Sequence, residues 1–243
     1  MLRVGTLTTI QQTGKGARCL RAVALPEAKF ILDNQHATNV GVMMDYETID
    51  YKGYKIKVMT DDSPSDPRDD DNLGTMVCFH SRYNLGDKNH GFTRESFIEF
   101  LEKNKDEIIA LHLYLLDHSG LTMSTGRFAC DAAGWDTSYV GLIYITKEKA
   151  RKEYGRLTKK TVARIEGYLK AEVETYDALL TGSCYGYQVV DKDGNEIADG
   201  SCWGYYGYDH TKSGLLESAQ YAIDYEIKRV LKDEGIQESL VLA

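Results

Sequence analysis

The sequence predicts an α+β fold, in which a largely antiparallel sheet built from hairpins packs with about three to four helices. Two observations lead to this prediction. Segments with the composition of strands are joined by short turns that contain glycine, and they are interleaved with segments whose apolar residues recur at helical spacing. The order along the chain lacks the strand–helix–strand regularity of parallel sheets. We therefore expect residues 45–243 to form a single α+β domain.

Turn and capping residues support the individual elements. Lys52-Gly53 and Asp193-Gly194 each separate two β-rich runs, as in short hairpins. Thr93 and Thr146 precede helical patterns in the manner of N-cap residues. The expected elements in chain order are a hairpin at 46–62, a strand at 75–80, a helix at 93–109, a strand pair at 110–116 and 121–125, a strand at 139–145, helices at 146–155 and 158–180, a hairpin at 184–208 and a helix at 213–234.

The first 44 residues differ in composition from the rest of the chain. They hold five Lys or Arg and two Asp or Glu, whereas the remaining residues carry 24 basic and 35 acidic side chains. All 17 tyrosines also follow residue 44. We interpret residues 1–44 as an N-terminal extension, either a basic arm or a misassigned start with Met43 or Met44 as the natural initiator, and we favour the misassigned start.

Composition also argues against several classes of function. The chain has no run of about 18 apolar residues and no secretory leader pattern, so we expect a cytoplasmic protein that does not contact a membrane. The five cysteines are scattered and form no CxxC pair, which is typical of reduced thiols. The net charge of -8 argues against direct binding to a nucleic-acid backbone.

The segment at 61–87 contains candidate metal ligands. Cys78 and His80 lie two residues apart on a predicted strand and so share a face, as two ligands would. Further ligands would have to come from Asp117, His118 or Cys130. In the alternative interpretation, Cys78 packs in the core while His80, Arg82 and Asp87 hold a loop by hydrogen bonds and an ion pair. We favour this alternative and expect no metal and no other cofactor.

The hairpin at 184–208 concentrates aromatic residues. Tyrosine and tryptophan rings there could form a recognition surface or pack across the strands, and both alternatives stay open. Trp203 is the best candidate for an anchor. We predict a binding surface that combines this hairpin with the segment at 78–87. Its predicted residues are His80, Arg82, Tyr83, Asp87, His118, Tyr185, Trp203 and Tyr205.

Three strings in the chain resemble a family of small uncharacterised proteins found in bacteriophages and related mobile elements. They are DNLGTMVCFHSRYNLGD at 71–87, LYLLDHSGLTMST at 113–125, and a series from residue 139 onward that includes GSCWGYYG at 200–207. The resemblance spans roughly residues 46–210. It implies an accessory protein in the host cytoplasm that binds a host macromolecule or a small host ligand, for instance to inhibit restriction, CRISPR or signalling immunity. It assigns no catalytic residue.

The competing class is an enzyme. A small hydrolase or transferase, metal-assisted or not, would use His80, Asp117 and His118 in a polar cleft. The two classes predict different geometries, since the enzyme requires these three side chains to converge within hydrogen-bond reach in a concave pocket.

Overall fold

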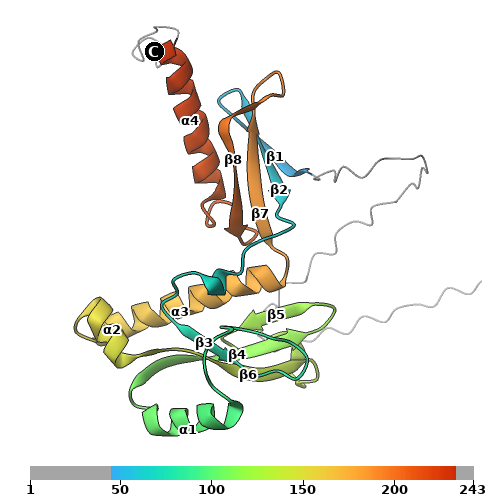
Figure 1. Cartoon of the computed structure of the whole chain (residues 1–243). Coiled ribbons are helices and arrows are strands. Elements are labelled where there is room, and N and C mark those ends of the chain that lie inside the picture. The colour runs from blue at the N-terminus through green and yellow to red at the C-terminus, as the bar shows by residue number, and fades with distance from the viewer. Residues whose placement is uncertain (1–44, 234–243) are drawn as a thin grey trace, which may run out of the picture. The chain divides into compact units, whose positions relative to one another are not determined.

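A computed structural model of the chain describes residues 45–233, so the extension predicted at 1–44 and the last ten residues lie outside the described residues. The α+β prediction is confirmed. Within the described range the chain forms four α-helices and two four-stranded antiparallel sheets (Figure 1). The strands therefore divide between two sheets, where the sequence led us to expect one. None of the helices described is long and apolar enough to cross a membrane.

The first sheet has the strand order β1-β2-β7-β8. Its strands are β1 (Asp45–Tyr51), β2 (Tyr54–Thr60), β7 (Cys184–Val190) and β8 (Glu196–Tyr206). Lys52 and Gly53 have φ angles of 49° and 82°, the left-handed pair that a tight hairpin turn requires. The helix α4 (Leu215–Asp233) packs on one face of this sheet, where Ile56, Tyr187 and Ile223 are buried together.

The second sheet has the order β3-β6-β4-β5. Its strands are β3 (Thr75–Cys78), β4 (Ile108–Asp117), β5 (Leu121–Ser124) and β6 (Thr137–Thr146). The helix α3 (Lys159–Leu180) covers one face and α1 (Arg94–Asn104) the other, while α2 (Lys147–Tyr154) joins β6 to α3 (Figure 1).

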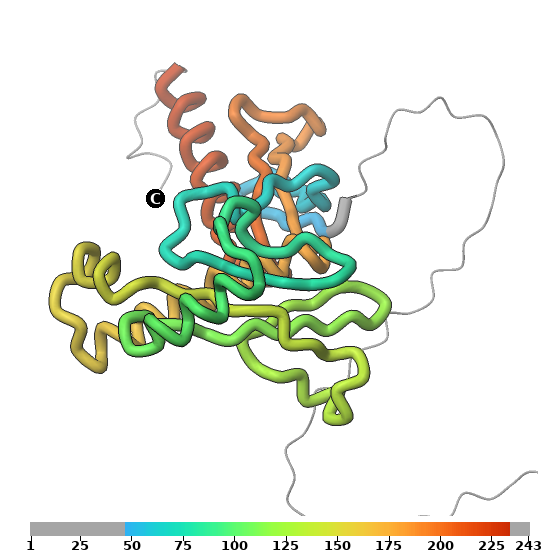
Figure 2. Tube along the Cα trace, turned by 60° about the horizontal axis from the view of Figure 1, so that its bottom comes forward, coloured from blue at the N-terminus to red at the C-terminus, as the bar shows by residue number. Residues whose placement is uncertain are grey.

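The order of elements explains why two sheets form. The two predicted hairpins, β1-β2 and β7-β8, pair with each other through β2 and β7, although about 120 residues separate them in sequence. The intervening chain builds the second sheet, so the blue β1-β2 segment and the orange β7-β8 segment lie side by side in one sheet (Figure 2). Hairpin signals are local and do not specify which hairpins become neighbours.

The helix predicted at 93–109 is shorter than expected. Thr93 caps it as predicted, but α1 ends at Asn104, and residues 108 and 109 begin β4. The Asn104 side chain donates to the Phe100 carbonyl, and its own carbonyl accepts the N–H of Glu107, so the chain turns there. Ile109 then faces the α3 side of the sheet, and pairing with β6 overrides the helical spacing of these isoleucines.

A bulge in β6 determines which side chains face the surface. Leu113 pairs with Gly141 and Tyr114 pairs with Tyr139, so Val140 is an extra residue in β6. Gly141 has φ 157°, and a Cβ atom at this position would lie 1.9 Å from the carbonyl oxygen of Val77. Only glycine fits so close to the neighbouring strand. The bulge buries Val140 in the core and places Tyr139 opposite Tyr114.

Candidate functional site

The predicted residues of the aromatic hairpin lie mostly in the core. Tyr185 is buried and Tyr205 is partly buried, both in the cluster beneath α4. Trp203 lies against Gly186, where a Cβ atom would come within 2.2 Å of the ring, and 38% of its surface is exposed. Cross-strand packing therefore accounts for Tyr185 and Tyr205, and Trp203 is the member of the three that reaches the surface.

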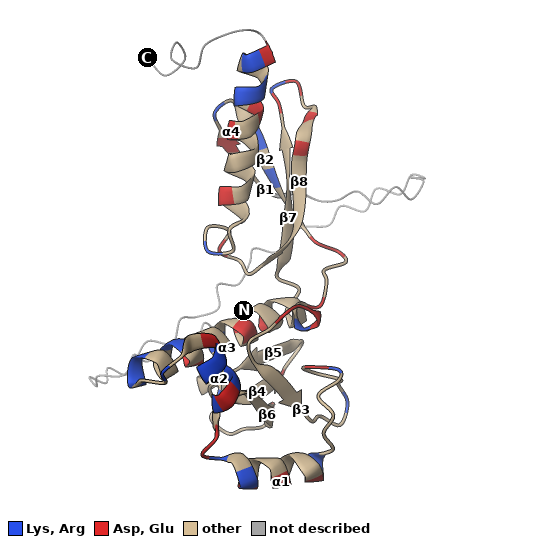
Figure 3. Ribbon diagram, turned by 60° about the vertical axis from the view of Figure 1, so that its left-hand side comes forward, with Lys and Arg blue, Asp and Glu red and all other residues tan. Residues whose placement is uncertain are grey.

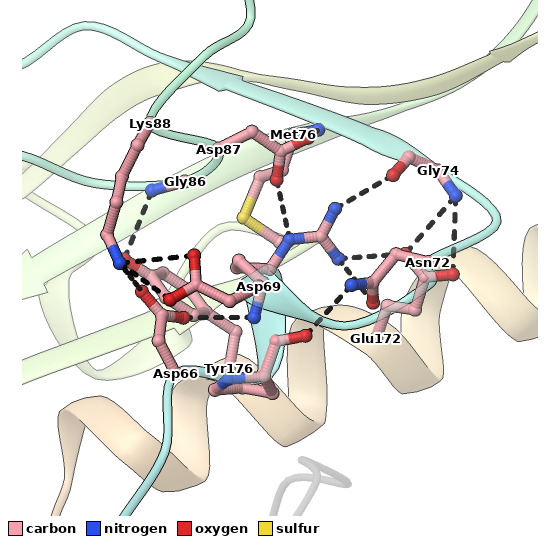
Figure 4. Close-up of polar contacts among 12 residues, drawn as sticks. Asp66, Asp69, Asn72, Gly74, Met76, Gly86, Asp87, Lys88, Glu172 and Tyr176 are labelled. Atoms are coloured by element: carbon pink, nitrogen blue, oxygen red, sulfur yellow. Dashed lines mark hydrogen bonds and ion pairs between the residues drawn. The ribbon is translucent and has the colours of Figure 1, made fainter.

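Asp87 belongs to a polar network around the buried Arg68 (Figure 4). Its Oδ1 accepts from Arg68 Nε at 2.7 Å, and its Oδ2 accepts from the Met76 N–H at 2.9 Å. Arg68 Nη1 also donates to Glu172 of α3 at 2.9 Å. Burial opposes the charge, but the bonds to Asp87 and Glu172 outweigh it and raise the pKa of Arg68. Asp87 therefore connects the acidic loop to β3, and both of its carboxylate oxygens take part in this network.

His80 organises the loop that follows β3. Its Nδ1 accepts the N–H groups of Arg82 and Tyr83, both at 3.3 Å, and its ring stacks on Tyr83 with centroids 5.0 Å apart. The Arg82 guanidinium forms an ion pair with Asp117. Burial raises the pKa of the Cys78 thiol to about 12, so this group is protonated at neutral pH. These contacts are those of a hydrogen-bonded loop.

The three residues of the enzyme alternative make no direct polar contact with one another. No hydrogen bond or ion pair joins any two of His80, Asp117 and His118. His118 Nδ1 instead pairs with Asp136 at 2.8 Å, and both of these side chains are exposed. Among the residues described, no group of three or more His, Cys, Asp or Glu side chains could hold a metal ion. The geometry therefore gives no support to a hydrolase or transferase built on these residues.

The loop that carries Asp136 also borders a cleft of about 340 Å³, which the sequence did not predict. We call it the aromatic cleft. It lies on the same sheet face as α1, since alternate residues of β4 place Tyr114 on the side of Ala110, which contacts the α1 cluster. The side chains that define it are Tyr114, Arg127, Phe128, Asp131, Thr137 and Tyr139.

The floor of the aromatic cleft consists of two rings. Tyr114 and Tyr139 meet edge to face, with centroids 5.8 Å apart and an interplanar angle of 66°. The Arg127 guanidinium lies 5.8 Å from the Tyr114 ring centre, and His112 lies 5.6 Å from Tyr139. Burial raises the pKa of Tyr139, so its hydroxyl keeps its proton and can donate. The cleft thus combines ring faces with a cation and a hydroxyl donor.

One carboxylate fixes the loop that walls the cleft. Asp131 accepts the N–H groups of Trp135, Asp136 and Thr137 at 3.1, 2.9 and 2.8 Å. Desolvation acts in the opposite direction, but these bonds prevail and lower the pKa of Asp131 to about 2. At neutral pH the Asp131 carboxylate is therefore ionised and accepts these three backbone hydrogen bonds. The His118–Asp136 pair holds the same loop from the other side.

The loop presents Trp135 almost entirely to solvent, with 88% of its surface exposed. The sequence patterns predicted neither this residue nor the cleft beside it as a site. The available signal was a tryptophan within the polar, glycine-containing stretch CDAAGWDTS, because such a ring has no strand or helix partner in its own segment. The position of Tyr139 depends on the bulge at Gly141, which no local pattern announces.

The chain matches no family model, no curated protein and no solved structure.

Proposed function

We propose that the chain is a binding protein that recognises a host protein or a small host ligand through the aromatic cleft and the adjacent Trp135. The exposure of one large ring on a fixed loop and of another on the adjoining strand β6 is the observation that carries this proposal. Trp135 is 88% exposed and Tyr139 is 53% exposed, beside the Arg127 guanidinium. Tryptophan, tyrosine and arginine are the residues that most often dominate the energetics of binding interfaces.

The loop supports binding because it is already ordered in the free protein. Three backbone bonds to Asp131 and the His118–Asp136 pair hold the chain on both sides of Trp135. A partner would then meet rings whose backbone needs no further ordering, which reduces the entropic cost of association. The concave floor beside Trp135 suits one projecting side chain or a small planar group.

The resemblance to bacteriophage and mobile-element proteins supports a biological setting for this activity. Two of the resembling strings contribute residues to the cleft, since Tyr114 lies in LYLLDHSGLTMST and Tyr139 is the first residue of the third series. In this proposal the protein acts in the host cytoplasm and blunts a defence system such as restriction, CRISPR or signalling immunity. Binding alone suffices for such inhibition.

The test compares variants of the cleft with a matched control. The tagged full chain, Trp135→Ala, Tyr139→Ala and Tyr221→Ala would each be incubated with bacterial lysate, and bound proteins and small molecules identified by mass spectrometry. Tyr221 is the control because it lies on α4 and is 72% exposed, so its removal tests the loss of a surface ring as such.

We expect one partner to be retained by the wild type and by Tyr221→Ala, and to bind each cleft variant about 30-fold more weakly or worse, which corresponds to about 2 kcal/mol. The purified partner and titration calorimetry provide that number. A partner that binds all four proteins equally would show that the aromatic cleft is not the binding site.

A further inference from the structure

A second surface of the molecule is positively charged, although the net charge of the chain is negative. Residues 147–170, which form α2 and the first half of α3, contain nine Lys or Arg and three Asp or Glu in a chain of net charge -8. Figure 3 shows these basic residues gathered on α2 and the adjoining start of α3. We call residues 147–170 the basic helix pair.

Most of these cations have no structural task. Lys147 and Lys149 donate to backbone carbonyls, of Asp106 and of Asn72 and Leu73 respectively. Five others are exposed and form no ion pair with any residue of the described range. They are Arg151, Lys152, Arg156, Lys159 and Lys160. A cluster of like charges without partners attracts an anionic ligand, and at physiological salt the screening length of about 8 Å makes the local cluster count for more than distant acidic residues.

Two tyrosines lie among the cations. The rings of Tyr154 in α2 and Tyr168 in α3 stack with centroids 6.1 Å apart and an interplanar angle of 24°. The Arg164 guanidinium lies 5.1 Å from the Tyr154 ring centre. Tyr168 is 45% exposed, so one ring of the stack is open to a further planar group. Both tyrosines line a cavity of about 440 Å³ whose lining also includes Asp70, Asp71 and Glu172.

A glycine lies within α3 beside these rings. Gly167 is exposed, and a Cβ atom there would meet nothing within 4 Å, so no packing contact requires glycine. Glycine costs about 1 kcal/mol relative to alanine inside a helix. Lys160, Arg164 and Gly167 recur at spacings of four and three and so share one side of α3. At Gly167 no side chain covers the helix backbone on the side that carries the cations, so another chain can approach the backbone closely there.

We propose that the basic helix pair binds single-stranded nucleic acid, with backbone phosphates on the unpaired cations and a base stacked on Tyr168. Stacking on exposed aromatic rings among cations is how proteins hold unpaired strands. The carboxylates of Asp70 and Asp71 direct the phosphates away from the cavity and toward the cations. A membrane surface fits less well because Ile165 and Leu169 of α3 are buried, which leaves no apolar side to insert. This surface is independent of the aromatic cleft and revises the expectation drawn from net charge.

Fluorescence anisotropy with labelled 20-nucleotide oligomers tests the proposal on the full chain. Single-stranded DNA, single-stranded RNA and duplex DNA would be titrated at several salt concentrations. The charge variant is Arg156→Gln, Lys159→Gln and Lys160→Gln together, and the stacking variant is Tyr168→Ala. The control removes three exposed lysines that make no ion pair elsewhere in the described range, by Lys105→Gln, Lys192→Gln and Lys228→Gln.

The two variants should fail differently. The charge variant is expected to bind at least tenfold more weakly, and its plot of log K against log salt should be shallower by about 2, since three phosphate contacts contribute about 0.7 each. Tyr168→Ala is expected to bind about tenfold more weakly with an unchanged slope, because stacking releases no counterions. The control triple variant should bind like the wild type, and melting curves verify that all variants fold.

Several outcomes would overturn the proposal. Absence of binding to both single strands at 50 mM salt would do so directly. Duplex DNA bound as tightly as either single strand would remove the role of the stacked base. Equal losses in the charge variant and the control would reduce the effect to net charge. Stronger binding to vesicles of anionic phospholipid, abolished by the same charge variant, would assign the surface to a membrane instead.

Discussion

Among single residues, Arg68 shows most clearly how a polar side chain can be structural. Its guanidinium donates to Asp87, to Glu172 and to the carbonyl of Gly74, which are carried by different segments of the chain. Two carboxylates and one carbonyl compensate a cation that has lost almost all of its water. Asp87 and Arg82 look alike in sequence as polar loop residues, but only the first belongs to this network.

Replacing Arg68 should therefore cost far more than replacing Arg82. Arg68→Met leaves Asp87 and Glu172 partly buried without their cation, and we expect the free energy of unfolding to fall by about 3–5 kcal/mol. Arg82→Met breaks an exposed pair with Asp117 and should cost less than about 1 kcal/mol. Urea denaturation of both variants makes the comparison. Equal losses would mean that the Arg68 network contributes no more than a surface pair.

Asp177 of α3 gives a prediction that depends on pH. Burial raises the pKa of this carboxyl, although its Oδ1 accepts the N–H of Met123 at 2.6 Å. A carboxyl whose folded pKa lies above its unfolded value of about 3.9 destabilises the fold once pH exceeds that value, and the penalty disappears when both states are protonated. Asp177→Asn keeps an oxygen acceptor and removes the charge.

We therefore expect Asp177→Asn to raise the free energy of unfolding at pH 7, the gain to shrink as pH falls through the raised folded pKa, and the gain to disappear below the unfolded pKa of about 3.9. Denaturation curves at pH 7, 5 and 3.5 measure the trend. Asp131 has the opposite pH dependence and provides the comparison. Because its pKa is lowered to about 2, its ionised carboxylate stabilises the fold at pH 7, and this stabilisation is lost as pH falls toward about 2. A gain for Asp177→Asn that stays constant across this range would show that the charge is not its cause.

Among the elements, α3 and β6 contain glycines with opposite roles. Gly167 occupies an exposed position in α3 with open space around it, whereas Gly141 in β6 is pressed against the Val77 carbonyl. The helix would form more readily without its glycine, and the sheet could not keep its bulge without the other. Glycine thus lowers the stability of the helix at Gly167, whereas at Gly141 it allows β6 to pack closely against β3.

Alanine at the two positions should shift stability in opposite directions. Gly167→Ala is expected to stabilise the protein by up to about 1 kcal/mol. Gly141→Ala should destabilise it by more than this, since the added Cβ would displace β3 or straighten the bulge, and the aromatic cleft would lose the placement of Tyr139. Thermal melting ranks the variants. Destabilisation by Gly167→Ala would reveal a packing requirement that the structure does not contain.

For the whole molecule, the connections predict how the two sheets unfold. The chain leaves the first sheet after β2 and returns at β7, so the pairing of β2 with β7 depends on the ordered segment between them. α3 leads directly into β7, where the Ser183 N–H bonds to the Ala178 carbonyl. We therefore expect a single cooperative transition rather than one for each sheet.

Core variants in each sheet test this expectation. Ile143→Ala in β6 and Ile223→Ala in α4 remove fully buried side chains from different clusters, and each should cost about 2–5 kcal/mol. Both should move the same calorimetric transition to lower temperature. If either variant splits the transition in two, the sheets unfold independently.

The sequence by itself determined the class of fold and the identity of most elements, because their signals are local. Lys52-Gly53, Thr146 and the spacing of apolar residues in α3 act within a few residues of themselves, and the structure reproduces each of them. At residues 105–109 the prediction was wrong, because pairing with a strand distant in sequence outweighed the helical pattern.

Tertiary structure alone decided which hairpins are neighbours, that Asp87 and Tyr185 face inward, and that Tyr114 and Tyr139 form a cleft. It also decided that Tyr154 of α2 and Tyr168 of α3 stack on each other beside Arg164. Each of these depends on contacts between distant residues, whose free energies no local pattern contains.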